Sequence, residues 1–138
     1  MIIPFNFPEL TIANAHPFIL IVMQLTRNHY HDSDPIVVTS TIRSIEEHIL
    51  IYKKRYGSKW LTKIAWKSGH LARPFDPTCY AIDFLRKEDI IDHLEFSIDR
   101  VEAMKIFPHF YYGIGIAKDF IHFDIAPERT RYSRWYYK

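Results

Sequence analysis

The segment 119–124 constrains this chain more than any other, because it reads D-F-I-H-F-D and places ionisable groups on an apolar strand. Its phenylalanines and isoleucine favour a β-strand, and alternate residues of a strand point to the same face, so His122 and Asp124 share a face. Burying two such groups costs free energy unless something binds them, and a metal ion is the usual partner of a histidine beside a carboxylate. The other interpretation is a half-exposed strand on which His122 is solvated.

Composition limits what can complete such a site. The chain has 138 residues, of which 48% are hydrophobic, and this fits a single domain over residues 1–138. Its single cysteine, Cys79, excludes an internal disulfide and a cysteine-rich zinc site, and we expect it to be a small core residue. Metal ligands must therefore come from the 8 histidines and the 16 acidic residues.

Charge and hydropathy restrict the partners of the chain. The net charge is +2 with no basic run, which predicts no nucleic-acid partner. The longest apolar run, 18–23, is far shorter than the ~20 residues that span a bilayer, so no membrane insertion is expected. No positive charge precedes Arg27, which is unlike a secretory signal. We therefore expect a protein that is cytoplasmic as synthesised, and that another factor releases if it acts outside that compartment.

Hydrophobic periodicity predicts three helices. Their expected bounds are 10–29, with an interruption near Pro17, 44–57 and 87–107. Ser44, followed by acids in the first turn, is expected to cap the second helix and Gly57 to end it. This helix carries three apolar residues that we expect to face inward, namely Ile45, Ile49 and Tyr52.

Five short segments rich in β-branched and aromatic residues predict strands. They are 36–40, 79–85, 110–116, 119–126 and 133–137. Residues 29–34 and 68–78 read as loops, and residues 59–67 fit either a helix or a strand. The last three strands are expected to form an antiparallel meander, and helices before and between the strands indicate an α+β fold.

Three motifs occur in a fixed order along the chain. They are T-S-T-I-R-S at 39–44, S-G-H at 68–70 with A-I-D at 81–83, and G-I-G at 113–115 with D-F-I-H-F-D at 119–124. This ordered set resembles the zinc D-Ala-D-Ala carboxypeptidase family, which includes phage endolysins and shares its fold with Hedgehog signalling domains. The family's first motif is close to T-S-G-x-R-S, of which this chain lacks only the glycine. The resemblance spans residues 36–135, where Arg129, Arg131 and Trp135 fit a tryptophan that commonly follows a basic stretch.

The resemblance implies a Hedgehog/DD-peptidase-like fold, in which helices flank an antiparallel sheet and residues before 36 form an N-terminal helical extension. It also implies a zinc ion (Zn2+) held by His70, Asp83 and His122, with a fourth position open for water. Zinc in such a site lowers the pKa of the water and polarises the scissile carbonyl. The implied substrate is a peptidoglycan stem peptide, cut by a monomeric carboxypeptidase or endolysin-like endopeptidase.

Three further residues receive roles from the resemblance. Asp119, three residues before His122, is the implied catalytic base, although odd spacing places it on the opposite strand face and it also suits a hairpin turn. Arg43 is implied to bind a substrate carboxylate, and its alternative is a surface ion pair with a glutamate of the following helix. Ser68 is implied to bind the substrate or to orient its loop.

Other polar residues of the motif region have structural interpretations. Asp124 is expected to support His122 through a hydrogen bond, or to pair with Arg129 or Arg131. The histidines of the N-terminal part have no partner pattern and are expected at the surface or in loops. They are His16, His29, His31 and His48.

One departure from the family's pattern leaves the first ligand open. The family places its first histidine seven residues before the aspartate, whereas His70 lies thirteen before Asp83. Either the intervening loop carries an insertion and His70 is the ligand, or the spacing is kept and Asp76 is the ligand. We favour His70, because a loop absorbs extra length at small cost and two imidazoles with one carboxylate suit zinc better than two carboxylates with one imidazole. Asp76 otherwise suits a turn before Pro77.

Two alternatives to a peptidase remain. The altered spacing favours a non-catalytic binding or structural module of the same fold that has lost its metal. The other alternative is a small α+β interaction domain in which the motifs are coincidental. It predicts that His70, Asp83 and His122 lie far apart.

Overall fold

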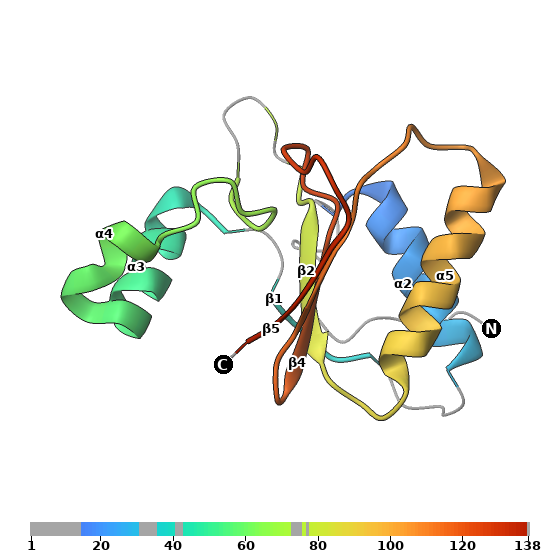
Figure 1. The fold of residues 1–138 in the computed structure, drawn as a ribbon, viewed down its shortest axis with the longest axis horizontal. Coiled ribbons are helices and arrows are strands. Elements are labelled where there is room, and N and C mark those ends of the chain that lie inside the picture. Colours follow the sequence, from blue (N-terminus) through green and yellow to red (C-terminus); the bar gives the residue numbers. More distant parts are fainter. Residues whose placement is uncertain (1–14, 31–35, 41–42, 73–75, 77, 138) are drawn as a thin grey trace.

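The computed structural model describes residues 15–30, 36–40, 43–72, 76 and 78–137, and in it a sheet stands between two groups of helices (Figure 1). The strands of this sheet are β1 (Val38–Ser40), β2 (Ala81–Leu85), β3 (Gly113–Ile116), β4 (Phe120–Asp124) and β5 (Ser133–Tyr136). Their order across the sheet is β1-β2-β4-β3-β5. The predicted α+β class, with helices flanking a sheet, is confirmed.

The sheet is mixed, so the prediction of an antiparallel sheet that closes with a meander is wrong. The pairs β1–β2, β2–β4 and β4–β3 are antiparallel, but β5 runs parallel to β3. In a meander β5 would pair with β4, but β2 and β3 already occupy both edges of β4. β5 therefore joins at the outer edge of β3, and the short connection 125–132 leaves it parallel to that strand.

Helices α2 (Pro17–His29) and α5 (Ile90–Met104) pack against each other on one side of the sheet (Figure 1). Pro17 stands in the first turn of α2, where a missing N–H costs little, and the His16 side chain accepts a hydrogen bond from Phe18 N at 3.0 Å. The predicted interruption near Pro17 is thus where the described helix begins, and residues 10–14 lie outside the described part. No helix in that described part is long and apolar enough to cross a membrane.

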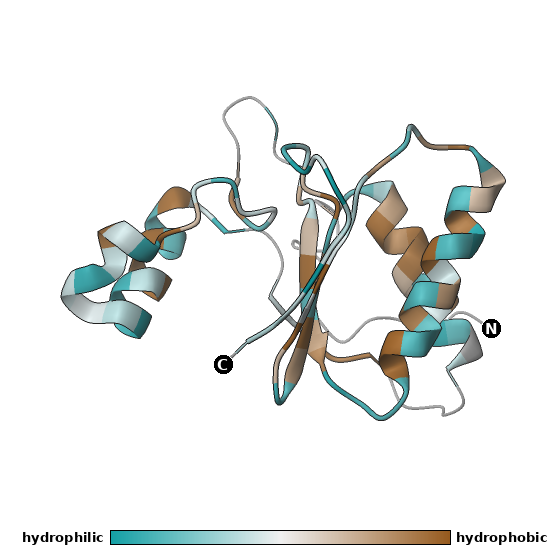
Figure 2. Cartoon of the chain, viewed as in Figure 1, coloured by the Kyte–Doolittle hydropathy of each residue, from teal (hydrophilic) through white to brown (hydrophobic). Residues whose placement is uncertain are grey.

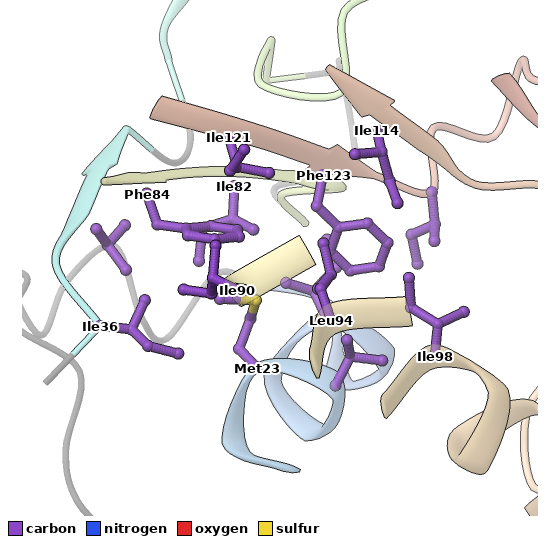
Figure 3. Close-up of a cluster of buried hydrophobic side chains, with 14 of the residues drawn as sticks. Met23, Ile36, Ile82, Phe84, Ile90, Leu94, Ile98, Ile114, Ile121 and Phe123 are labelled. Carbon is purple, nitrogen blue, oxygen red and sulfur yellow. The ribbon is translucent and has the colours of Figure 1, made fainter. Parts of the chain in front are cut away.

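Alternation along the strands directs apolar side chains toward α2 and α5. The strands contribute Ile82, Phe84, Ile121 and Phe123, and Figure 3 shows them packed against side chains of the two helices. The helical members of this core include Met23, Ile90, Leu94 and Ile98. In Figure 2 the hydropathy colours mark hydrophobic residues on the strands and on the two helices that cover this face. The residues between the apolar ones, Asp83 and His122, therefore point to the opposite face of the sheet.

A second helical group lies on the other side of the sheet and is called the lobe here (Figure 1). It comprises α3 (Ile45–Tyr56), the 3-10 turn η1 (Gly57–Lys59) and α4 (Trp60–Lys63). Ser44 Oγ accepts a hydrogen bond from Glu47 N at 3.2 Å, and Gly57, with a φ of 55°, ends α3. Both predicted ends of this helix are confirmed.

Two predictions about the faces of α3 are wrong. Ile45, expected to face inward, is 50% exposed. His48, expected at the surface, is fully buried, with Nε2 2.8 Å from Ala65 O. A buried polar ring is tolerated when a backbone carbonyl accepts its hydrogen bond, and this contact holds α3 against the segment after α4.

Candidate metal centre

Two strands bring an aspartate and a histidine side by side. Asp83 of β2 pairs directly with His122 of β4 in the antiparallel register. Their neighbours along each strand point into the core, so both side chains stand on the face of the sheet opposite to α2 and α5. The pairing places residues thirty-nine positions apart in the sequence within contact distance.

A loop after the lobe supplies the second histidine. His70 O accepts a hydrogen bond from Arg43 N at 2.6 Å, and Gly69 O accepts one from Tyr80 N at 3.1 Å, so both sides of the loop are fixed. A Cβ on Gly69 would lie 2.9 Å from Ala81 Cβ, which explains why a glycine precedes His70. The loop therefore lies close enough to β2 for His70 to reach Asp83.

Three donor atoms converge from these elements. His122 Nδ1 lies 2.8 Å from Asp83 Oδ1, His70 Nε2 lies 3.0 Å from the same oxygen, and the two nitrogens are 3.1 Å apart. All three residues are buried, and among the described residues they form a group that can hold a metal ion. Zinc bonds of about 2.0–2.2 Å at tetrahedral angles set donors roughly 3.4 Å apart, so this triangle is close to one face of a zinc tetrahedron. The alternative in which the three residues lie far apart is wrong.

Of the two residues left open as the first ligand, His70 lies in the three-residue cluster and Asp76 does not. Asp76 accepts hydrogen bonds from Thr78 N at 3.1 Å and from the Tyr80 hydroxyl at 2.6 Å. These are the contacts of a turn residue. Asp76 therefore organises the turn that precedes β2.

The electrostatics of the cluster suit a cation. Burial opposes ionisation of Asp83, but the charge of His70 and hydrogen bonds from both histidines hold the pKa of this carboxyl well below its usual range. Burial also lowers the pKa of His70 and favours the neutral imidazole. Burial alone would lower the pKa of His122, yet hydrogen bonds to Asp124 and Asp83 raise it to about 9. Asp83 and His70 would therefore hold a metal as a carboxylate and a neutral imidazole, and His122 would have to release a proton to join them.

His122 is oriented through its other nitrogen. His122 Nε2 lies 2.6 Å from Asp124 Oδ2, and Arg129 donates two hydrogen bonds to the same carboxylate, one of them from Nη2 at 2.7 Å. Both interpretations of Asp124 are thus correct, with Arg129 rather than Arg131 as the ion-pair partner. Because Asp124 accepts the Nε2 proton, Nδ1 is the atom presented to the cluster.

The glycines of G-I-G make room for the residues that support this arrangement. A Cβ on Gly115 would lie 2.7 Å from the Trp135 ring, and a Cβ on Gly113 would collide with the Arg129 guanidinium. The Trp135 ring lies 5.5 Å from the His122 ring, and the Arg129 guanidinium lies 5.1 Å above Trp135. This role was not predicted from the sequence, where its signal was two glycines two residues apart in a strand, a pattern that marks the close approach of other groups.

A cavity of about 500 Å³ opens over the cluster and is lined by Arg43 and Ser68. Arg43 Nη2 lies 3.9 Å from Asp83 Oδ2, while Arg43 Nε is buried and has no hydrogen-bond partner among the described residues. A buried donor without a partner is costly, which points to a ligand group that arrives here. Ser68 Oγ accepts a hydrogen bond from His70 N at 3.2 Å and so orients the loop.

Asp119 lies elsewhere. It is exposed in the turn between β3 and β4, and its backbone oxygen accepts a hydrogen bond from Arg86 N at 2.9 Å. The cavity is lined by the next residue, Phe120, but not by Asp119. Of the residues singled out in the sequence, the structure thus brings His70, Asp83, His122, Arg43 and Ser68 together and leaves Asp119 at the rim of the sheet.

Comparisons of this chain with protein-family models, with curated proteins and with solved structures gave no match.

Proposed function

We propose that this chain is a zinc-dependent peptidase that hydrolyses peptidoglycan stem peptides, as a carboxypeptidase or an endolysin-like endopeptidase. The observation that carries the proposal is the triangle of His70, Asp83 and His122 beside the buried guanidinium of Arg43. The substrate class and the type of bond come from the resemblance of the ordered motifs. Three protein ligands leave a fourth position for water, as catalytic zinc sites do.

Several residues that line the cavity have a role in this reaction. Zinc, when bound, supplies a water of lowered pKa and polarises the peptide carbonyl. Arg43 binds a substrate carboxylate through its planar fork, and this contact provides the partner that Nε lacks. Ser68 accepts the His70 N–H, and because a hydroxyl accepts and donates at once, it can also donate to the substrate. Asp124 and Arg129 keep His122 in the orientation that binds the metal.

The reaction also needs a base that takes the proton of the water and passes it to the leaving amine. The resemblance gives this task to Asp119, which requires the β3–β4 turn to approach the cavity. Glu128 is a second candidate, because it lines the cavity already. Substitution distinguishes them: the variant of the true base, Asp119→Asn or Glu128→Gln, loses kcat by 100-fold or more, on the order of what such a base contributes, and the other variant retains it.

The exposed position of Asp119 favours one alternative, a non-catalytic module of the same fold that binds stem peptides without cutting them. Such a module would bind the peptide through Arg43 and release no product. Incubation of the metal-loaded protein with a stem peptide, followed by mass spectrometry, separates the two functions. Cleavage supports the peptidase, and binding without cleavage supports the module.

Elemental analysis tests the metal assignment directly. We expect one zinc per chain in the unaltered protein, and a loss of bound zinc in His122→Ala, which removes one of three ligands. His109→Ala is the matched control, because His109 is exposed and outside the cluster. Asp76→Asn should also retain zinc, since Asp76 serves the turn. Unchanged zinc content in His122→Ala would overturn the assignment.

A further inference from the structure

The cavity is lined by more positive side chains than the proposed chemistry uses. Arg129 pairs with Asp124, and Arg43 lies near Asp83. Three further cations line the same cavity, namely Arg55 of α3, Lys67 after α4 and Arg131 after β4. In the part of the chain that the structure describes, none of these three makes an ion pair with a carboxylate.

These cations come from two different walls. Arg55 and Lys67 belong to the lobe and the segment that leaves it, whereas Arg131 belongs to the connection between β4 and β5. Arg55 shares the cavity lining with Tyr137, a residue that follows β5. Burial raises the pKa of the Tyr137 hydroxyl, and the charge of Arg55 makes a small opposing contribution. All three side chains are exposed at their positions, so they surround the mouth of the cavity rather than its floor.

The carboxylates that line the cavity do not balance the charge of these cations. The lining carries five Lys or Arg side chains against three carboxylates, and two of these, Asp83 and Asp124, are engaged by the histidines and Arg129. A bound divalent metal adds further positive charge at the floor. The lobe and the segment that leaves it have the same bias: residues 45–67 contain six Lys or Arg and two Glu, whereas the rest of the chain contains twelve Lys or Arg and fourteen Asp or Glu.

We propose that Arg55, Lys67 and Arg131 form an anion subsite at the mouth of this cavity. This inference rests on the proposed function and names its substrate class. The subsite takes a second carboxylate of the substrate, beyond the group that Arg43 binds beside the metal. The preferred substrate is therefore an acidic peptide, and the same peptide with that carboxylate converted to an amide binds less well. A cavity of about 500 Å³ is large enough for a short peptide that spans both positions.

The expected preference is moderate. A single exposed ion pair contributes little in water, but three cations that line one cavity attract the same carboxylate together and also raise the association rate. We expect the acidic peptide to bind about tenfold tighter than its amide at low salt, and the preference to shrink as salt screens the charges.

The test uses two synthetic peptides that differ only in glutamate against glutamine at one position, titrated by calorimetry into the zinc-loaded and the metal-free chain. In Arg55→Gln, Lys67→Gln and Arg131→Gln, and in their combination, we expect the preference to fall toward onefold. Lys63→Gln is the matched control, because Lys63 is an exposed lysine of the same lobe that does not line the cavity. It should keep the full preference.

Several outcomes overturn the subsite. Equal affinity of the two peptides, no binding of either one, or a preference that survives the triple substitution each exclude it. Failure of the proposed function is a separate result: a chain that binds no zinc, or cuts no peptide, can still show the preference for the acidic peptide. Circular dichroism of the triple variant confirms folding, which exposed substitutions of this kind leave intact.

Discussion

The ring of His122 is fixed at both nitrogens, and this single side chain links the candidate metal to a chain of charged partners. Nδ1 belongs to the three-donor cluster, and Nε2 lies 2.6 Å from the carboxylate of Asp124, which Arg129 neutralises in turn. The sequence alone predicted that His122 and Asp124 share a strand face, because that follows from a period of two. It left the partner of Asp124 open, because the choice between Arg129 and Arg131 depends on how the 125–132 connection turns.

The first prediction concerns Asp124. Asp124→Asn keeps the shape of the side chain but removes the charge that holds the His122 proton and the Arg129 guanidinium. We expect zinc affinity to fall by about 10–100-fold, in line with other substitutions of groups that orient metal-bound histidines. Competition with a chromogenic chelator measures it. Asp92→Asn, an exposed change on α5, is the control, and equal affinities of the two variants would contradict the assigned role.

The second prediction concerns pH. The pKa of His122 in the metal-free protein is about 9, above its ordinary value of 6.5. The stabilisation from protonated His122 is therefore fully present below pH 6.5 and is lost as the pH rises through about 9. We expect the Tm of the metal-free protein to fall over this window, and to fall less in His122→Gln. His109→Gln serves as the control, and an identical pH profile in His122→Gln would refute the prediction.

At the scale of elements, the residues of strand β3 are restricted by the side chains that pack on it. Its two glycines form a floor for Trp135 and Arg129, while Ile114 between them is buried in the core. The strands β2 and β4 could be predicted from the alternation of apolar and polar residues. The position of β5 in the sheet could not, because it depends on which strand edges the other strands already occupy. The burial of His48 in the lobe was not predicted either, because the sequence of α3 does not show which segment packs against this helix. In the structure that segment contains Ala65.

The third prediction concerns Gly115. In Gly115→Ala the new Cβ would lie 2.7 Å from the Trp135 ring, so the ring must move away from His122. We expect a loss of about 1–3 kcal/mol in the free energy of unfolding, typical of overpacking, together with weaker zinc binding. Urea denaturation and chelator competition provide the two measurements.

Ile114→Val is the control for this strand, because Ile114 points to the opposite face. It should cost about 0.5–1.5 kcal/mol in stability and leave zinc affinity unchanged. If Gly115→Ala lowered stability without any change in zinc affinity, Trp135 would have no part in holding His122.

Across the whole molecule, the sheet separates the hydrophobic core from the candidate site. Apolar side chains between the sheet and α2 and α5 form the core, and the polar face toward the lobe carries the cluster and its cavity. The ordered motifs predicted which residues meet, because the second motif contributes His70 from a fixed loop and Asp83 from β2, and the third contributes His122 from β4. The resemblance implied Asp119 as the catalytic base, whereas its odd spacing from His122 indicated the other strand face or a turn, and in the structure Asp119 is exposed in the β3–β4 turn outside the cavity lining.

The fourth prediction follows from this separation. Leu94 is fully buried in the core and does not line the cavity. We expect Leu94→Ala to lower the free energy of unfolding by about 2–5 kcal/mol through the lost contacts and the remaining void. Zinc content of the folded fraction should stay the same. A loss of zinc in the folded variant would show that core and site are not independent.

The place of β5 has a consequence for synthesis. A nascent chain that has emerged from the ribosome as far as residue 126 already contains all three donor residues, but not Arg129 or the tryptophan that leans on His122. The groups that orient His122 are therefore the last of the cluster's surroundings to be synthesised. The position of this ring is complete only once the final strand has docked beside β3.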